Sequence, residues 1–598
     1  MRVRKWHLRK NPMKISFSSI SKSISESQLT LILSVLVGVI TGCAAVLLRE
    51  LIHIVGNFVW GTLTTGILAW VKFIAPAVGM LLSLLIVRYL VRDNIGHGVT
   101  RVLKAVSRNN SNIKPHNTWS SLLTSALTIS FGGSVGAEAP IVYTGAAIGS
   151  NIGRKAGLSY KNITILLGCG AAAAVAGIFK APMAGVLFTL EILLFNISMS
   201  SIIPLLISSV TAAAISYLHQ GRAVTFAAGI EDYMLGNIPY YILLGLVGGF
   251  MSLYFIRSTL SLEDRLKKYK NPYLRWLICS VGLCSLIFLF PPLFGEGYEP
   301  LGQVLAGKPS EMLSSKMVFG SLTEYKWFVP IFFTAVMFLK VPAMSFTNAG
   351  GGVGGTFGPT LIVGGMAGFV FSRIINLSGF HALPESNFAL VGMAALMAGV
   401  MQAPMTAIFL IAEITGGYSL LFPLIIASVV SYATIRVFEP YSIYSKRLAV
   451  AGDLLTHDSD QAVLTLLNTG DFVEKDFETV GVNDTLGVLV DRVSHCKRNL
   501  FPVIDDKGHI CGVISLDDIR EVMFNQDLYN ALCVYNLMRE VPVIVEVHEH
   551  MDSVMEKFEQ SGAWNLPVVD EDSRYLGFIS KSKIFSSYRE RLHQVSSE

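Results

Sequence analysis

The chain has 598 residues, of which 52% are hydrophobic and only 15% are charged. Soluble globular proteins carry about 25% charged residues, so this composition excludes an ordinary soluble protein. The seven cysteines are too few for a disulfide-stabilised scaffold. A protein that crosses a membrane several times is the class that remains.

The charge is divided unevenly along the chain. Residues 1–452 hold 34 basic and 16 acidic residues, whereas residues 453–598 hold 13 basic and 26 acidic ones. A membrane part is therefore followed by a soluble part of ordinary composition. The predicted divisions are a basic tail at 1–26, a membrane domain at 27–450, a linker at 451–469, and two soluble units at 470–526 and 527–598.

Long apolar runs begin directly after the basic tail. The first, at 28–48, has 21 residues without a charge, which is enough to span a bilayer as a helix. Seven Lys or Arg residues in the tail predict that it stays cytosolic, and the run is too long for a cleavable signal peptide. Further charge-free runs lie at 162–179, 192–221, 233–256, 276–295 and 414–435.

Two charge-poor segments are interrupted by glycine. Gly132 and Gly133 break the segment at 120–153, and three glycines at 350–352 break the segment at 341–372. Broken helices at membrane depth survive only where protein buries them or where they line a cavity. Both breaks are therefore candidates for a transport site.

The membrane part repeats internally. Residues 176–192 align with 398–414 at an offset of 222 with 7 identities in 17, and residues 132–140 align with 351–359 at an offset of 219. Glycine and proline recur by chance in membrane helices, but chance does not explain two nearly equal offsets. Broken segments at matching positions of two halves indicate a transport site between the repeats.

Glu138 is the one charged residue between Ser120 and Arg154, and it lies in the sequence GAEAP at 136–140. An ionisable group in such a segment is a functional hypothesis by default. The flanking Gly and Pro predict a loop that enters a helix, whose free N–H groups would hold an anion. The carboxylate would compete with that anion until it is protonated. The alternative is a carboxylate that caps its own helix.

Three further features belong to this pattern. Residues 355–359 (GTFGP) repeat it without the acid, and predict a helix N-terminus from the other half. His97 lies in a third glycine-flanked break and belongs either to the site or to a surface loop. Glu191 and Glu413 end equivalent helices, and this symmetry favours structural roles such as bonding the N–H groups of a neighbouring loop.

Four signatures in order resemble the CLC family of chloride channels and chloride/proton antiporters. They are GHGVT at 96–100, GAEAP at 136–140, GTFGP at 355–359 and Tyr444 in SIYSKRL. The resemblance covers about 30–450. It implies an α-helical polytopic membrane protein of two inverted repeats, a homodimer with one pore per subunit, and Glu138 as the gate. The implied anion-binding residues are His97, Gly98, Gly136, Ala137, Glu138, Thr356, Phe357, Gly358 and Tyr444.

The chain departs from the family pattern at two functional positions. His97 replaces the serine of the family, which puts that side-chain anion ligand in doubt. Ile192 stands where family antiporters commonly carry a second acid that feeds protons to the gate. Because family channels also have an aliphatic residue there, we favour a gated chloride channel. A chloride/proton antiporter is the alternative, since some members exchange protons without that acid.

The soluble part also repeats. Residues 501–505 match 566–570, and residues 512–519 match 577–584, both at an offset of 65. The pattern predicts two small α/β units and resembles a tandem CBS pair, which often binds adenine nucleotides. The resemblance implies ribose contacts from Ser515, Asp518 and Ser580, with Lys583 in place of the second acid. A dimerisation and gating module without a ligand is the alternative.

Other function classes are weaker hypotheses. A CBS-linked cation channel would need rings of carboxylates or carbonyls, whereas the pore segments offer one acid and several helix N-termini. The fluoride-exporting branch generally lacks CBS tails. The sequence has no credible nucleophile–base pair or metal cluster, so we expect no enzymatic activity and no nucleic-acid partner. We expect chloride as the transported ion, a multi-pass location in the cell membrane, cytosolic termini, and a homodimer through both domains.

Overall fold

The computed structural model describes residues 25–59, 71–93, 95–193, 199–221, 229–309, 322, 325–450, 469–541 and 543–586. The chain forms two compact units, residues 1–454 and residues 455–598, and each is described by itself. The predicted basic tail and the predicted linker lie almost entirely outside the described residues.

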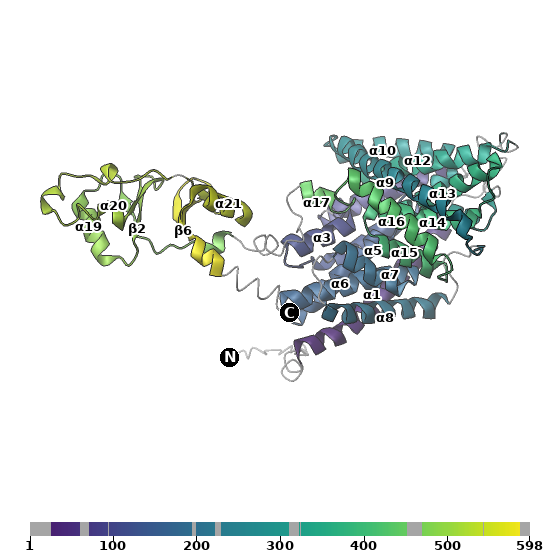
Figure 1. Ribbon diagram of the computed structural model, residues 1–598, viewed down its shortest axis with the longest axis horizontal. Helices are drawn as coiled ribbons and strands as arrows, with labels where there is room; N and C mark the ends of the chain where they lie inside the picture. Colours follow the sequence, from purple (N-terminus) through teal and green to yellow (C-terminus); the bar gives the residue numbers. More distant parts are fainter. Residues whose placement is uncertain are drawn as a thin grey trace, which may run out of the picture. The chain divides into compact units, whose positions relative to one another are not determined.

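The described part of the first unit is built of helices, drawn from purple to green in Figure 1. They are α1 (Glu26–Asn57), α2 (Val71–Leu85), α3 (Gly98–Arg108), α4 (Ser120–Ser130), α5 (Glu138–Lys155), α6 (Tyr160–Phe179), α7 (Pro182–Phe188), α8 (Met199–Gln220), α9 (Ile238–Lys267), α10 (Pro272–Leu289), α11 (Tyr298–Leu305), α12 (Phe328–Ala349), α13 (Phe357–Ser378), α14 (Glu385–Met401), α15 (Pro404–Ile414), α16 (Leu421–Phe438) and α17 (Lys446–Val450).

Nine helices in the described part of the chain are long and apolar enough to cross a membrane. The predicted runs at 28–48 and 162–179 lie within α1 and α6. Both predicted breaks are present, because seven residues separate the end of α4 from the start of α5, and seven separate the end of α12 from the start of α13. The run at 233–256 underestimates α9, which continues through charged residues to Lys267. Part of the run at 192–221, residues 194–198, lies outside the described residues.

The sequence repeat reappears in the helices. α7 and α15 begin at residues 182 and 404, and α8 and α16 begin at 199 and 421, so both pairs keep the offset of 222. α5 packs against α6, and α13 packs against α14 in the same way. A side chain on Gly145 would overlap the carbonyl of Gly170, and one on Gly364 would lie 2.5 Å from the carbonyl oxygen of Gly392. Small residues thus let both helix pairs approach closely.

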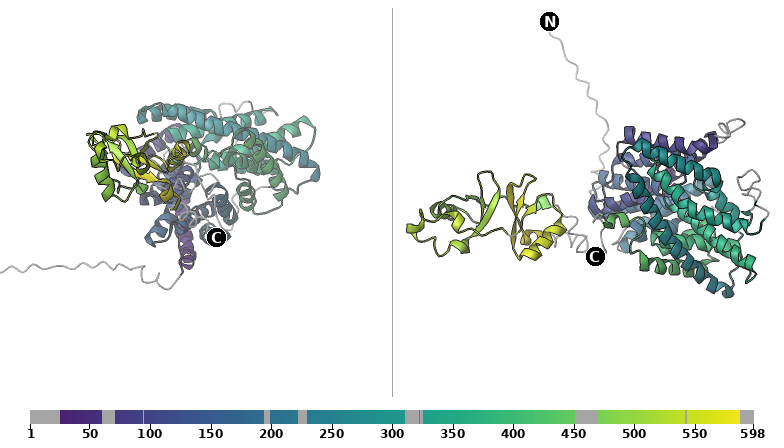
Figure 2. Two further views of the ribbon diagram at one scale, coloured as in Figure 1. Left: turned by 60° about the vertical axis from the view of Figure 1, so that its left-hand side comes forward. Right: turned by 90° about the horizontal axis from the view of Figure 1, so that it is seen from above.

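The second unit contains two sheets with the same topology, seen as two adjacent lobes in Figure 2. In each sheet a short strand pairs parallel to the middle strand, which pairs antiparallel to the third. Corresponding strands and the first helices begin 65 residues apart, which confirms the predicted pair of α/β units. The elements are β1 (Val480–Gly481), α19 (Leu486–His495), β2 (Leu500–Ile504), β3 (Ile510–Ser515), α20 (Leu516–Ile519), β4 (Val545–Glu546), α21 (Met551–Ser561), β5 (Asn565–Val569) and β6 (Tyr575–Ser580).

The segment before β1 packs with the second lobe rather than the first. Phe472 lies in the hydrophobic core around α21, β5 and β6. The backbone of Glu474 exchanges two hydrogen bonds with that of Phe578, at 2.7 and 3.0 Å. The second lobe is therefore completed by residues that precede the first one in sequence. The offset of 65 could not reveal this exchange.

Candidate functional site

The two glycine breaks of the first unit meet each other. The N–H of Gly136 donates to the carbonyl of Gly355 at 3.1 Å, and the N–H of Gly355 donates to the carbonyl of Gly136 at 2.7 Å. This reciprocal pair joins the loop before α5 to the loop before α13. Two helix N-termini from different halves of the sequence are therefore held side by side, and both carry partial positive charge.

Glu138 reaches from one of these N-termini to the other. It is the first residue of α5 and is 1% exposed. Its carboxylate accepts the N–H of Gly358, in the first turn of α13, at 3.2 Å, and the hydroxyl of Tyr298 also donates to it. A side chain on Gly136 would overlap this carboxylate. The contact with α13 argues against a carboxylate that only caps its own helix.

A second acid occupies the start of α5. Glu296, in the turn between α10 and α11, accepts the N–H of Ala137 at 3.1 Å. Lys340 of α12 is 0% exposed and lies beneath this turn. Its ammonium group donates to the Ser134 hydroxyl at 2.8 Å and to the Gly295 carbonyl at 2.9 Å.

The sequence analysis missed both Glu296 and Lys340. Lys340 is the one charged residue of α12, so the rule that selected Glu138 would also have selected it. Glu296 follows the charge-free run at 276–295 and therefore resembles an ordinary segment end. Its contact with Ala137 spans 159 positions of sequence and depends on how the helices pack.

The remaining predicted anion-binding residues surround the same region. The Thr356 hydroxyl donates to the hydroxyl of Tyr444 at 3.2 Å, and Thr100 donates to the Tyr444 carbonyl at 3.1 Å. Gly98 begins α3, and a side chain there would lie 2.5 Å from the carbonyl oxygen of Ala139 in α5. The Phe357 ring is buried 5.3 Å from that of Phe179. All four sequence signatures thus converge.

A cavity on the Tyr444 side is lined by residues of α3, α5, α9 and the two segments around Thr356 and Tyr444. The imidazole Nε2 of His97 lies 3.2 Å from the carboxylate of Glu263, and Arg447 also pairs with this carboxylate. His97 therefore faces an acid of α9, an arrangement different from an exposed loop histidine. Among the described residues, the second Glu263 oxygen and the Thr259 hydroxyl are buried without a hydrogen-bond partner.

Glu191 and Glu413 hold the two halves together reciprocally. Glu413 accepts the N–H groups of Met183 and Ala184 at the start of α7, at 3.0 and 2.9 Å. Glu191 accepts the N–H groups of Met405 and Thr406 at the start of α15, at 3.0 and 2.7 Å. The structure thus shows the structural bonding that their symmetry predicts, and α7 and α15 lie side by side (Figure 1).

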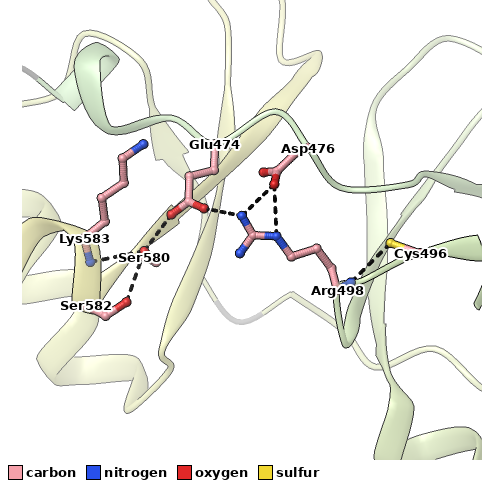
Figure 3. A network of polar contacts seen from close by, with 7 residues as sticks. All are labelled: Glu474, Asp476, Cys496, Arg498, Ser580, Ser582 and Lys583. Carbon is pink, nitrogen blue, oxygen red and sulfur yellow. Dashed lines mark hydrogen bonds and ion pairs between the residues drawn. The ribbon is translucent and has the colours of Figure 1, made fainter.

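The predicted nucleotide-contacting residues of the second unit are bonded within the chain. The Ser515 hydroxyl donates to the Asp518 carboxylate at 2.8 Å, and Arg539 pairs with the same carboxylate. In the second lobe, Ser580 donates to Glu474 at 2.8 Å (Figure 3). Each lobe therefore keeps a hydroxyl beside a carboxylate.

In the second lobe, Lys583 stands at the position that Asp518 occupies in the first lobe, and the carboxylate beside Ser580 comes from Glu474 instead. Lys583 offers Ser580 only its backbone N–H, at 3.3 Å, and its side chain extends away from Ser580 (Figure 3). Arg498 of the first lobe donates to Glu474 at 2.7 Å and to Asp476 at 2.7 Å. Hydrogen bonding from Arg498 lowers the pKa of Asp476. A network of charges thus joins the two lobes beside Ser580.

Sequence comparison agrees with this geometry. The family profile described as voltage gated chloride channel matches residues 78–436, and the CBS domain profile matches residues 470–525 and 534–590. The chain belongs to the voltage-gated chloride channel family. It is a membrane protein of a family that transports anions. This chain also carries two CBS domains. Such proteins are transporters and channels rather than enzymes.

Relatives within the family differ in their named activities. The chain is 27% identical to chloride channel protein CLC-e of Arabidopsis thaliana over 67% of this chain and 59% of that protein. It is 26% identical to the H(+)/Cl(-) exchange transporter ClcA of Salmonella paratyphi B over 72% of this chain and 90% of that protein. The fold matches a slow cyanobacterial Cl-/H+ antiporter with a TM-score of 0.60 and 22% identity, over 71% of this chain and 97% of that one.

Proposed function

We propose that this protein conducts chloride through a pathway between α5 and α13, gated by Glu138. The observation that carries the proposal is the Glu138 carboxylate on the N–H of Gly358, at the junction of two helix N-termini. A chloride ion bound by these N–H groups would compete with the Glu138 carboxylate for the same position. Protonation of Glu138 removes its charge and gives the place to chloride.

The anion-binding part of the proposal uses the N–H groups near Ala137, Phe357 and Gly358. The paired hydroxyls of Thr356 and Tyr444 close the opposite side. His97 remains a candidate ligand near this closure, although its ring is engaged with Glu263. The proposed assembly is a homodimer in the cell membrane, with both termini in the cytosol.

Passive conduction is the mode we propose. Ile192 is 5% exposed beside Glu191, whose carboxylate is already bonded to α15, so no free acid stands at this position to pass protons. Proton-coupled exchange is the second candidate. It is favoured by the relatives named as exchangers and by Glu263, a buried acid that lines the cavity below Tyr444.

Reconstitution separates these modes. The purified full chain is placed in liposomes loaded with chloride, and chloride efflux and external pH are recorded together. We expect chloride efflux without uphill proton movement. Stoichiometric uphill proton movement would establish the exchange mode instead, and potassium efflux without chloride efflux would contradict the anion pathway itself.

We also propose that the CBS pair binds an adenine nucleotide through Ser515, Asp518 and Ser580, with Glu474 as the acid beside Ser580. The bound nucleotide would supply charge and contacts that modulate the gate. Titration of the full chain with AMP and with ATP tests this directly. Asp518→Asn and Glu474→Gln should each weaken binding, and saturable binding unchanged in both variants would contradict these contacts.

A further inference from the structure

We propose that Glu296 is a second gating carboxyl, so that chloride enters only when Glu138 and Glu296 have both released the N–H groups they occupy. The inference rests on the proposed function and adds a residue to the same site. The two acids bond the N-termini of two different helices. Glu138 occupies an N–H at the start of α13, and Glu296 occupies an N–H at the start of α5.

The two occupied N–H groups belong to one junction. Ala137 follows Gly136 and Gly358 follows Phe357, and the reciprocal bonds between Gly136 and Gly355 hold these segments together. Release of Glu138 alone frees the α13 side. The Glu296 carboxylate would still repel an anion and still hold the Ala137 N–H. One titrating acid is therefore insufficient to clear the site.

Protons added to the cluster around Glu296 make its net charge positive. The groups that act on it are Glu138 of α5, Tyr298 of α11, Lys340 of α12 and Arg49 of α1. The Glu138 and Glu296 carboxylates are offset by the Lys340 ammonium and the Arg49 guanidinium, so these four groups sum to zero charge when both acids are ionised. Each proton that a carboxyl takes up leaves one uncompensated positive charge, which favours entry of an anion. Carboxyls this close release and take up protons as a coupled pair.

Glu296 is also the less enclosed of the two acids. It is partly exposed, whereas Glu138 is buried. Tyr298, two residues beyond Glu296, donates to Glu138, so one short turn contacts both carboxyls. A proton reaching Glu296 from the surrounding water therefore arrives beside the gate. A Glu296 that only capped α5 would add no step to the pH response.

The test is the pH profile of chloride efflux from liposomes that contain the full-length protein, from about pH 4 to about pH 8. Wild type, Glu138→Gln, Glu296→Gln and the double variant are compared. The matched control is Glu299→Gln, an exposed acid three residues away. We expect the wild-type opening to require two protonation steps, each single variant to require one, and the double variant to show no pH response. The control should match wild type.

The outcomes distinguish the inference from the function beneath it. Absent chloride efflux in wild type would contradict the proposed function. Efflux in Glu138→Gln that is already independent of pH, or a response of the same steepness in Glu138→Gln and the double variant, would overturn the role of Glu296 alone. If Glu296→Gln does not fold, Glu296→Asp in the Glu138→Gln background replaces it. That shorter acid should move the midpoint of the remaining response, and an unmoved midpoint would also overturn the inference.

Discussion

The two halves of the membrane unit have equivalent helices, but they differ in the charged residues that they place where the two glycine breaks meet. Glu191 and Glu413 occupy equivalent positions and make equivalent bonds to the opposite half. At the other equivalent pair, the first half carries Glu138 and the second carries Phe357, 219 residues later. The symmetric acids thus bond the two halves to each other, whereas the asymmetric acid Glu138 lies on the proposed anion pathway.

Lys340 is the counterpart asymmetry of the second half. Positions 118–121, which correspond to it at offsets between 219 and 222, hold no charged residue. At this junction the first half therefore contributes the buried acid Glu138 and the second half contributes the buried base Lys340. Both lie next to the turn that carries Glu296, so charge is concentrated where the symmetry of the repeats is lost.

Breaking the symmetric pair should have the largest effect. Glu413→Ala leaves two N–H groups at the start of α7 without an acceptor, and Glu191→Ala does the same at α15. A buried donor without an acceptor costs about 1–3 kcal/mol, and the Met183 and Met405 contacts are exposed, so each variant should lose about 1–3 kcal/mol of stability. Thermal unfolding in detergent measures this loss.

The matched controls are Glu413→Gln and Glu191→Gln, which keep one carbonyl acceptor and should lose less stability. In all four Glu191 and Glu413 variants, the pH profile of any chloride efflux that remains should match that of the wild type. If one alanine variant is destabilised and the other is not, the two halves do not share the scaffold role in the way described.

Removing the asymmetric acid should change transport and leave the fold intact. Glu138→Gln keeps the size of the side chain and removes the charge that competes with chloride. We expect efflux at neutral pH to rise about tenfold, which corresponds to about 1.4 kcal/mol. A gate formed by Glu138 alone would lose its pH dependence completely in this variant. With Glu296 beside it, we expect a shallower response instead, while unchanged efflux and steepness would remove Glu138 from the gate.

Removing the buried base Lys340 should also shift the pH response of chloride efflux. This variant removes a positive charge, whereas Glu138→Gln removes a negative one. Lys340→Met retains an unbranched, buried side chain but no ammonium group. A nearby cation favours ionised carboxyls, so its loss should let them keep protons to higher pH. We expect the efflux midpoint to rise by about one pH unit and the maximal efflux to fall. A midpoint that stays in place would show that Lys340 serves packing only.

The fold and half of this charge arrangement could be predicted from sequence. Composition and glycine breaks gave the membrane class, the two halves and Glu138, because each is written in local pattern. Glu296 and Glu263 could not be assigned this way, since their partners Ala137 and His97 lie more than 150 residues away. Glu474 was missed for the same reason, because it crosses to the lobe that follows in sequence.

The two lobes of the second unit also contain an equivalent pair of acids, Asp505 and Asp570, which can be compared in the same way. Asp505 accepts the N–H groups of Lys507 and His509 at 2.9 and 2.8 Å, and Asp570 makes the same turn in the other lobe. The N–H of His509 holds the pKa of Asp505 below its usual range. Stability from this turn is therefore present above the unfolded pKa of about 3.9 and is lost as pH falls through the lower folded value.

Hydrogen exchange of residues 505–510 in the full chain measures this effect, after correction for intrinsic rates. Acidification should weaken protection of this turn in wild type, and Asp505→Asn should weaken it at all pH values with little further change on acidification. Asp570→Asn should act on residues 570–575 alone. Because the turn is exposed, the effect should be the smallest of those considered. A turn in Asp505→Asn that still loses protection on acidification would mean that another group carries the pH dependence.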